Sequence, residues 1–251
     1  MKTSTPYTEK FYLKLRDEKL AYSADKVLSV VLQNLPPVNS VIDVGCGVGT
    51  WLLSFLKSRN RQIDILGIDG PWVDSNLLAI PKDNFLAVDL SLEMPRIDKR
   101  YDLAISLEVA EHLPPEKAEE FVSFLTRLSD FVLFSAAIPF QGGTNHFNEQ
   151  WQGYWASLFK QKNYVPVDFI RPVLWNDEKI PFHYRQNTIL YSKQVRVKEI
   201  KLPSLLDGQM LSLSHPEYYT KHTHPGVKRA FRLFRAALRR FIAKSLVKKK
   251  D

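Results

Sequence analysis

A buried strand that runs into a glycine-rich loop and then a helix is the feature that most constrains this fold. The stretch is VIDVGCGVGTWL, in which a mostly β-branched run at 41–44 precedes Gly45, Gly47, Gly49 and an apolar helical pattern. Glycines at such a turn permit positive φ angles, and the following helix presents unpaired backbone N–H groups to a ligand. The stretch therefore predicts a cofactor site at the end of a strand.

The order of elements after this loop indicates an α/β fold. The runs IDILGID, NFLAVDL, YDLAISLE and FVLFSAA read as buried strands, and the helical pattern EKAEEFVSFLTRL precedes the last of them. Buried strands separated by helices are typical of a parallel sheet with helices on both faces. A later helix at about 149–162 and strands near 164–170 and 187–195 predict an antiparallel edge strand. We expect a mostly parallel sheet.

Four segments of the chain differ in pattern. Residues 1–35 predict an N-terminal helical cap, which ends at two prolines, and residues 36–200 carry the main domain. Residues 201–226 contain three prolines and no clear period, so an irregular linker is expected there. Residues 227–251 combine an apolar stripe at helical spacing with many Lys and Arg, which predicts a basic amphipathic helix.

The positive charge of the chain is confined to this last segment. The formal net charge is +8, but residues 228–251 hold ten Lys and Arg and one Asp, which leaves −1 for residues 1–227. The main domain therefore lacks the signature of a nucleic-acid groove, and composition disfavours a nucleic-acid partner without excluding it. Two alternatives stay open for residues 227–251: a helix on an anionic membrane surface, or a helix packed on its own domain.

Cysteine content and hydropathy indicate the compartment. Cys46 is the single cysteine, so neither a disulfide framework nor a Cys-rich zinc site is expected. The N-terminus has no uninterrupted apolar region, and no run of about 18 apolar residues predicts a membrane span. We expect a cytoplasmic protein, with peripheral attachment to the inner face of the membrane through residues 227–251 as the open alternative.

Three aspartates lie at or just beyond the ends of successive predicted strands. They are Asp43, Asp69 and Asp89, and ligands of open α/β sheets bind on this side. The glycine spacing is G-C-G-x-G rather than the dinucleotide pattern G-x-G-x-x-G. A carboxylate two residues before Gly45 disfavours a pyrophosphate and suits a positively charged cofactor.

The run DVGCGVG resembles motif I of class I S-adenosylmethionine-dependent methyltransferases, and the resemblance extends over about residues 36–195. It implies a Rossmann-like methyltransferase sheet with S-adenosylmethionine as cofactor. In that family an acid after the second strand binds the ribose hydroxyls and a polar residue after the third contacts adenine, roles that fall on Asp69 and Asp89. The predicted cofactor site comprises Asp43, Gly45, Cys46, Gly47, Gly49, Asp69, Gly70, Asp89, Leu90, Leu107 and Glu108.

A second polar cluster occurs in SLEVAEHLPPE, at the end of the predicted strand YDLAISLE. If a helical turn begins after Glu108, spacings of three and four bring Glu108, Glu111 and His112 toward a common point. The motif is similar to the E-x-x-E-H of small-RNA 2′-O-methyltransferases and of ubiquinone-biosynthesis O-methyltransferases, where it binds a divalent cation. In the RNA enzymes a histidine follows the next strand in a run resembling H-x-F-E-W, and HFNEQW supplies His146 here.

The resemblance implies that Glu108, Glu111, His112 and His146 are catalytic residues and ligands of Mg²⁺ or Mn²⁺. Imidazole ligands fit Mn²⁺ or another transition metal better than Mg²⁺. The sequence departs from the RNA enzymes because Thr144 and Asn145, rather than a histidine cluster, precede His146. Two alternatives remain: a histidine that acts as a metal-free general base, and a purely structural polar network.

Aromatic residues beside polar ones suggest a carbohydrate acceptor. The runs GGTNHFNEQW and WNDEKIPFHYRQN also resemble methyltransferases encoded among bacterial surface-polysaccharide genes. That resemblance implies O-methylation of a sugar hydroxyl on a surface glycan or its lipid-linked precursor. The alternatives are an RNA ribose 2′-hydroxyl, a hydroxyl of a small molecule, and a noncatalytic cofactor-binding subunit.

Overall fold

The structure is a computed structural model that describes residues 18–58, 63–201, 212–223, 226–227, 230–232 and 234–235. The chain divides into two compact units, Met1–Leu213 and Ser214–Asp251. Of the predicted N-terminal helical cap, the structure describes helix α2 (Glu18–Asn34), and the part before residue 18 lies outside the described residues.

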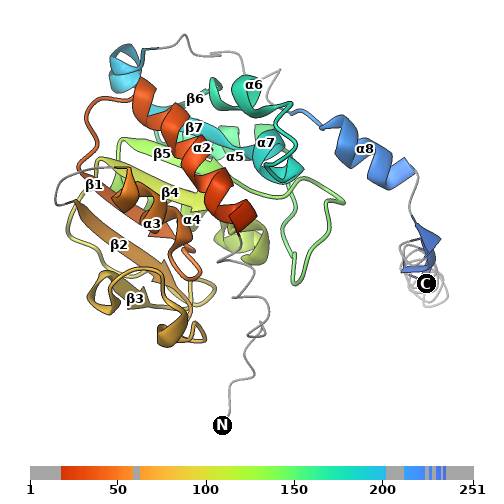
Figure 1. Ribbon diagram of the computed structural model, residues 1–251, viewed down its shortest axis with the longest axis horizontal. Helices are drawn as coiled ribbons and strands as arrows, with labels where there is room; N and C mark the ends of the chain where they lie inside the picture. Colours follow the sequence, from red (N-terminus) through yellow and green to blue (C-terminus); the bar gives the residue numbers. More distant parts are fainter. Residues whose placement is uncertain are drawn as a thin grey trace, which may run out of the picture. The chain divides into compact units, whose positions relative to one another are not determined.

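A seven-stranded sheet organises the described part of the first unit (Figure 1). Its strand order is β3-β2-β1-β4-β5-β7-β6. The strands are β1 (Ser40–Val44), β2 (Asp64–Asp69), β3 (Phe85–Ala87), β4 (Leu103–Leu107), β5 (Phe131–Ser135), β6 (Tyr164–Val167) and β7 (Ile189–Lys193). Strands β1 to β5 pair in parallel, and β7 runs antiparallel between β5 and β6. The mostly parallel sheet is confirmed, and its antiparallel strand lies one position in from the edge.

The strand order reverses between β1 and β4, and this reversal positions the functional site. In β1, Val41 pairs with Ile65 of β2 on one side and with Leu103 of β4 on the other. In open α/β sheets, ligands bind beyond the carboxyl ends of the strands at such a reversal. The loops that follow β1 and β4 therefore flank one crevice.

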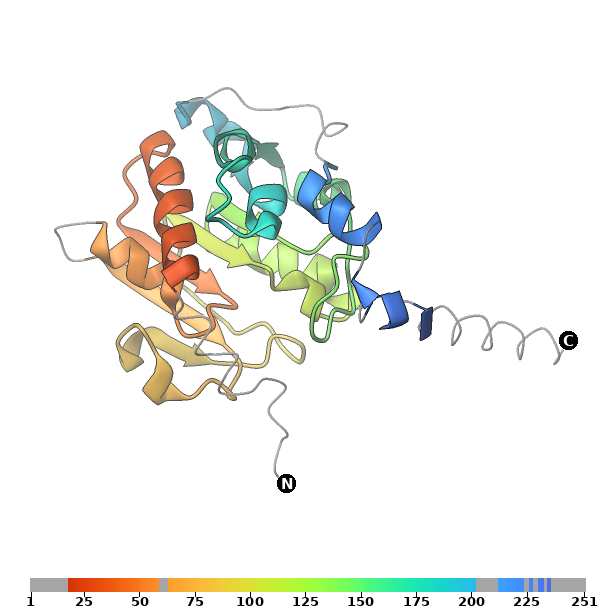
Figure 2. The same ribbon diagram turned by 45° about the vertical axis from the view of Figure 1, so that its right-hand side comes forward.

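One face of the sheet is covered by α2 and α3 (Thr50–Lys57), which lie side by side in both ribbon views (Figures 1 and 2). Helix α2 is amphipathic and buries Val27 and Val31 against alternate strand residues such as Ile105. The short helices α6 (Ile170–Leu174) and α7 (Phe182–Asn187) contribute to the same apolar cluster.

The opposite face is covered by α4 (Ala118–Leu128) and α5 (Gln152–Gln161). Trp155 of α5 is only 1% exposed and packs against Phe134 of β5, with 5.3 Å between ring centroids. Every residue of β4 and β5 is buried. Since successive side chains of a strand point to opposite faces, both faces of these two strands are covered, as their continuous apolar sequences predict.

Short 3₁₀ helices occupy several of the connections. They are η1 (Ser75–Leu77), η2 (Lys82–Asn84), η3 (Ala110–His112), η4 (Pro115–Lys117) and η5 (Gln194–Glu199). The predicted helix at 116–128 is thus a 3₁₀ turn that leads into α4. Because η3 directly follows β4, the polar cluster of the sequence lies on a tight turn at the end of the sheet.

The second unit contains a helix within the segment 201–226, for which the sequence predicts an irregular linker, and for residues 216–223 this expectation was wrong. Helix α8 spans Pro216–Thr223, and the imidazole Nδ1 of His215 accepts a hydrogen bond of 3.1 Å from the backbone N of Glu217. Proline suits a first helical position because its missing N–H has no partner there, so Pro216 begins a helix rather than breaking one.

Only part of the predicted basic helix at 227–251 is described. Residues 227, 230–232 and 234–235 are helical, and the remainder of the segment lies outside the described residues. Among the residues that the structure describes, no helix combines the length and the apolar character needed to cross a bilayer.

Candidate functional site

A cavity of about 1090 Å³ lies beside the glycine loop and the carboxyl ends of β1, β2 and β4. Its volume is near the upper end of the range of about 300–1,000 Å³ that is usual for small-molecule sites. Every residue of the predicted cofactor site except Gly49 lines it, and so do Glu111, His112 and His146. The two predicted sites therefore share one cavity.

The glycine loop depends on backbone conformations that other residues rarely adopt. Gly45 and Gly49 have φ angles of 84° and 85°. A Cβ atom on Gly45 would lie 2.3 Å from Cγ2 of Val109, so glycine allows the loop to approach the segment after β4. A Cβ atom on Gly49, which precedes α3, would lie 2.9 Å from Cγ1 of Ile80. The side chain of Ile80 therefore leaves no room for a Cβ atom at position 49, which accounts for the glycine there.

Asp69, the last residue of β2, connects the glycine loop to the neighbouring strand. Its Oδ2 accepts a hydrogen bond of 2.7 Å from the backbone N of Gly47, and its Oδ1 accepts one of 2.7 Å from the backbone N of Gly70. Burial raises the pKa of the Asp69 carboxyl, while these two hydrogen bonds act in the opposite direction. The carboxylate is therefore fixed in orientation at the cavity wall.

Asp43 is a buried acid whose charge is poorly compensated. It is 2% exposed, and its Oδ2 has no hydrogen-bond partner. Burial, reinforced by repulsion from Asp69, raises the pKa of the Asp43 carboxyl well above its ordinary value. Buried polar atoms without partners are rare in native proteins. An unpaired carboxylate in the wall of a cavity suits a cationic or hydrogen-bond-donating ligand.

Asp89 forms a local turn and also lines the cavity. Its Oδ1 accepts hydrogen bonds from the backbone N of Ser91 at 2.9 Å and from the hydroxyl of Ser91 at 2.6 Å. Leu90, between them, is 6% exposed and also contacts the cavity. The turn accounts for Asp89 structurally, and its position at the end of the sheet leaves it available to a ligand.

Glu108 follows β4 in a left-handed conformation, with a φ of 56°. Such a conformation costs a residue other than glycine about 1–2 kcal/mol and is often found at functional sites. Its carboxylate accepts hydrogen bonds from the side-chain amides of Gln141 at 2.8 Å and Asn187 at 3.2 Å. Glu108 lies outside the turn η3, which begins at Ala110, so it does not join Glu111 and His112 at a common point as expected.

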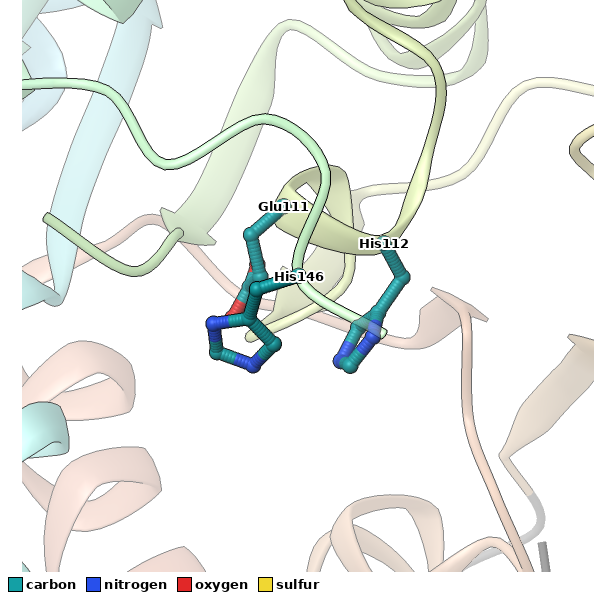
Figure 3. Close-up of side chains that lie close together, drawn as sticks. All are labelled: Glu111, His112 and His146. Carbon is teal, nitrogen blue, oxygen red and sulfur yellow. The ribbon is translucent and has the colours of Figure 1, made fainter. Parts of the chain in front are cut away.

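Three of the four predicted metal ligands do lie together (Figure 3). The ligand atoms of Glu111, His112 and His146 are all within 4.8 Å of one another. Glu111 is fully buried, and neither of its carboxylate oxygens has a hydrogen-bond partner. Burial, together with the charge of Glu108, raises the pKa of the Glu111 carboxyl well above its ordinary value. Glu111, His112 and His146 are called the Glu–His cluster below.

Each imidazole of the Glu–His cluster is oriented by an oxygen atom. Nδ1 of His112 lies 3.3 Å from the carbonyl oxygen of Asn145, and Nδ1 of His146 lies 3.0 Å from Oε1 of Glu149. These oxygens only accept, so each Nδ1 carries the proton and each Nε2 of a neutral ring holds a lone pair. Burial and the nearby His146 lower the pKa of His112, which favours its neutral form. Metal-binding histidines are typically held in this way.

Glu149 also anchors the loop that carries His146. It accepts hydrogen bonds of 2.7 Å from the backbone N of Phe140 and of 2.7 Å from that of Gly142. Burial opposes ionisation of Glu149, but the hydrogen bonds from His146, Gly142 and Phe140 outweigh it and lower its pKa. Sequence reasoning placed Glu149 only in the acceptor-side run GGTNHFNEQW and not beside His146, although its position three residues after His146 was a usable signal.

Among the side chains of the described cavity lining, acids outnumber every other charged type. Among the described residues that line it are five carboxylates and no Lys or Arg; the acids are Asp43, Asp69, Asp89, Glu108 and Glu111. Low-dielectric walls with charges of one sign concentrate the field inside a cleft. The cavity therefore favours cationic ligands and disfavours phosphate-rich ones.

Comparisons with known proteins give a family match and a fold match. A family model described as a methyltransferase domain matches residues 16–162. Two uncharacterized methyltransferases of Mycobacterium leprae, from strains Br4923 and TN, are each 27% identical over 150 residues, which is 57% of this chain and 55% of the relative. The chain therefore spans about half the length of these curated relatives.

A solved structure of similar fold is the plantazolicin methyltransferase BpumL, in complex with a pentazolic desmethylPZN analog and SAH. The TM-score is 0.51 at 15% sequence identity, and the match covers 73% of this chain and 88% of that one. At this identity the likeness concerns the fold alone. It agrees with the Rossmann-like methyltransferase sheet expected from the sequence.

Proposed function

The chain belongs to the family of methyltransferase domains, and on this premise we propose that it methylates a hydroxyl group of an uncharged, hydroxyl-rich acceptor. The acceptor class is a sugar of a surface glycan or of its lipid-linked precursor, and the methyl donor is S-adenosylmethionine. The observation that carries the proposal is the shared cavity, which the Glu–His cluster and the glycine loop both line and whose described lining contains no Lys or Arg.

The residues around the glycine loop fit S-adenosylmethionine. When bound, this cofactor supplies an electrophilic methyl group on a positively charged sulfur. The positive φ angles at Gly45 and Gly47 open the loop toward the ligand, and the fixed carboxylate of Asp69 offers acceptors for ribose hydroxyls. The unpaired Oδ2 of Asp43 lies in the same wall, and a bound cation would favour the ionised form of this carboxyl. BpumL, of the same fold, was solved with SAH, which supports the same assignment here.

The Glu–His cluster fits a divalent cation. Ligands at about 2.1 Å from a metal lie up to about 4.2 Å apart, so ligand atoms that all lie within 4.8 Å of one another need only small side-chain rotations. Three protein ligands leave positions open for oxygen atoms of an acceptor, and two imidazoles favour Mn²⁺ over Mg²⁺. A cation held by Glu111, His112 and His146 would lower the pKa of a coordinated hydroxyl.

A metal-free route uses the same residues. Neutral His112 has a lone pair on Nε2, because Nδ1 is turned to the carbonyl of Asn145. Such an imidazole can accept the proton of the acceptor hydroxyl as a general base. Glu111 would then stabilise the resulting imidazolium. The two routes differ in their response to a chelator.

The charge of the cavity favours a neutral acceptor over RNA. A ribonucleotide carries a phosphate at each residue, and proteins usually meet these phosphates with Lys and Arg. The described cavity lining offers five carboxylates and no Lys or Arg instead. Neutral sugars present adjacent hydroxyls without charge, so they avoid this repulsion.

Two measurements test the proposal. Titration calorimetry with S-adenosylhomocysteine should detect binding to the purified full chain, and absence of binding would contradict the cofactor assignment. Methyl transfer should then occur to neutral glycans and not to oligoribonucleotides, and the reverse preference would support the RNA alternative. Loss of activity with a chelator and recovery with Mn²⁺ supports the metal route, whereas indifference to the chelator favours His112 as the base.

We place the enzyme at a membrane surface as part of this proposal. The described apolar residues of the basic segment are solvent-exposed: Val227 is 87%, Phe231 is 61% and Phe234 is 63% accessible. Exposed phenylalanines beside Arg232 and Arg235 suit the interface of an anionic bilayer. Such attachment would bring the cavity to acceptors carried on lipids at the inner face of the membrane.

A further inference from the structure

Three polar side chains from separate segments form a closed ring of hydrogen bonds at the cavity wall. Nδ2 of Asn187, the last residue of α7, donates to Oε1 of Glu108 at 3.2 Å and to Oε1 of Gln141 at 2.9 Å. Nε2 of Gln141 donates in turn to Oε2 of Glu108 at 2.8 Å. Each carboxylate oxygen of Glu108 is thus held by one amide. The pair Gln141 and Asn187 is called the amide clamp below.

The orientation of Asn187 is fixed from behind the cavity. Its Oδ1 accepts hydrogen bonds from Nε2 of Gln186 at 2.9 Å and from Nε2 of Gln152 at 3.4 Å. Asn187, Gln186 and Gln152 are all buried, with at most 3% exposure. Because an amide oxygen only accepts and an amide nitrogen only donates, this contact turns Nδ2 toward Glu108 and Gln141.

The three side chains of the ring differ in solvent exposure, which separates residues that can contact a ligand from one that only positions them. Glu108 and Gln141 both line the cavity and are partly exposed, whereas Asn187 is 2% exposed and does not line it. Each carboxylate oxygen has more than one acceptor site, and Nε2 of Gln141 has a second N–H. The cavity side therefore presents fixed acceptors next to a fixed donor.

That combination matches the hydrogen-bonding of adjacent hydroxyls. A hydroxyl group donates one hydrogen bond and accepts others, so a carboxylate beside a carboxamide satisfies two neighbouring hydroxyls at once. The side chains of Trp51 and Tyr184 also line this cavity, with ring centroids 5.3 Å apart. Burial raises the pKa of Tyr184, and the charge of the nearby Glu108 contributes to this shift. An apolar ring face beside polar hydroxyl partners suits a pyranose.

We propose that Glu108 and Gln141 form a recognition subsite for vicinal hydroxyls of the acceptor, and that Asn187 is the positioning residue that holds it. The proposal rests on the proposed function, since it names the part of the same cavity that binds the hydroxyl groups of the acceptor sugar. Glu108 is then not a metal ligand, because it does not belong to the Glu–His cluster.

The test uses the full-length protein with a panel of methyl hexosides and their monodeoxy analogues as probes. Asn187→Asp and Gln141→Glu keep the side-chain shape but replace an amide donor by a second carboxylate facing Glu108. We expect each to raise the acceptor KM about tenfold, the value of a lost hydrogen bond to a charged group. The preference for the hydroxylated sugar over its monodeoxy analogue should fall by a similar factor.

The controls separate this role from folding and from the cofactor site. Gln161→Glu makes the same chemical change at an exposed position at the end of α5 and should leave the acceptor KM unchanged. Affinity for S-adenosylhomocysteine should stay within about twofold in all three variants. Thermal denaturation verifies folding, and Gln141→Glu, on a partly exposed loop, serves where Asn187→Asp is unstable.

The outcomes distinguish the subsite from the proposed function. A loss of S-adenosylhomocysteine affinity that matches the rise in KM would assign Glu108 to the cofactor and overturn the subsite. An unchanged KM and an unchanged preference against the monodeoxy sugar would overturn it as well. If the wild-type protein binds S-adenosylhomocysteine but methylates no hexoside of the panel, the acceptor class is wrong and the subsite falls with it.

Discussion

The imidazole rings of His112 and His146 meet edge to face, with 4.8 Å between ring centroids and 88° between ring planes. The two residues come from different segments, the turn η3 after β4 and the loop after β5. Each ring is held through Nδ1 by an oxygen atom, and Glu111 lies with them under the same loop. Imidazole rings held in this way have the orientation that a metal or proton-transfer site requires.

Glu149→Gln should weaken the Glu–His cluster without removing one of its members. Glutamine keeps an oxygen for Nδ1 of His146 but loses the negative charge, and it cannot satisfy both loop amides as well as the carboxylate does. Loss of such a supporting carboxylate typically reduces metal affinity about 10–100-fold. Calorimetry with MnCl₂ measures this directly.

A matched control exists on α4, where Glu119 is 66% exposed and lies 3.6 Å from Lys162. Glu119→Gln removes the same charge away from the cluster, so it should bind Mn²⁺ as the wild type does. Equal Mn²⁺ affinity in the wild type and in Glu149→Gln would show that His146 does not depend on Glu149 for metal binding.

Gly143→Ala should disturb His146 through steric contact alone. A Cβ atom on Gly143 would lie 2.0 Å from Nε2 of His146, far inside van der Waals contact, so the ring must leave its position beside Glu111 and His112. We expect loss of Mn²⁺ binding and about a hundredfold fall in kcat/KM, while affinity for S-adenosylhomocysteine is kept. Gly226→Ala is the control, because nothing lies within 4 Å of its added Cβ. Retained Mn²⁺ binding in Gly143→Ala would contradict the assignment of His146.

Asp43→Asn should stabilise the ligand-free protein at neutral pH and weaken cofactor binding. Because the folded-state pKa of Asp43 is raised, the folded protein binds its proton more tightly than the unfolded chain does. The contribution of this proton to the free energy of unfolding is therefore lost as pH rises from about 3.8 toward the raised pKa of Asp43 in the folded protein. An asparagine side chain does not titrate, so the variant does not lose this stability. The excess stability of Asp43→Asn over the wild type should be absent near pH 3.8 and grow toward pH 8.

Thermal denaturation across this pH range, without ligand, measures the effect of Asp43→Asn. Each kcal/mol corresponds to about 2–4 °C in the melting temperature of a domain of this size. Calorimetry with S-adenosylhomocysteine should show the opposite sign, with weaker binding by the variant. A melting difference that does not vary with pH would contradict the raised pKa.

The fold and the part of the cavity beside the glycine loop followed from local sequence patterns. Strand, glycine loop and acid recur at fixed short spacings, and parallel topology brings the ends of β1, β2 and β3 to one side. For this reason Asp43, Asp69 and Asp89 could all be located before the structure. The same patterns did not reveal that Gly49 serves packing against Ile80 rather than the cavity.

The other half of the site depends on long-range contacts that leave no local signal. Glu108 meets Gln141 and Asn187 across 33 and 79 residues of sequence, and no periodic pattern encodes such pairs. Glu108 was expected at a common point with Glu111 and His112, but it adopts a positive φ just before η3 and is not a member of the Glu–His cluster. The prediction required a helical turn after Glu108, and the turn that follows, η3, begins only at Ala110.

The membrane proposal makes a prediction for the two exposed phenylalanines of the basic segment. Phe231→Ser combined with Phe234→Ser removes apolar area from side chains that are 61% and 63% accessible while leaving every positive charge in place. Flotation of the full chain with vesicles that contain anionic phospholipid should fall at least about tenfold, since each buried phenylalanine contributes about 1.5–3 kcal/mol. Binding that is unchanged by the substitutions and abolished by salt would indicate a purely electrostatic attraction, and absence of wild-type flotation would remove the membrane role.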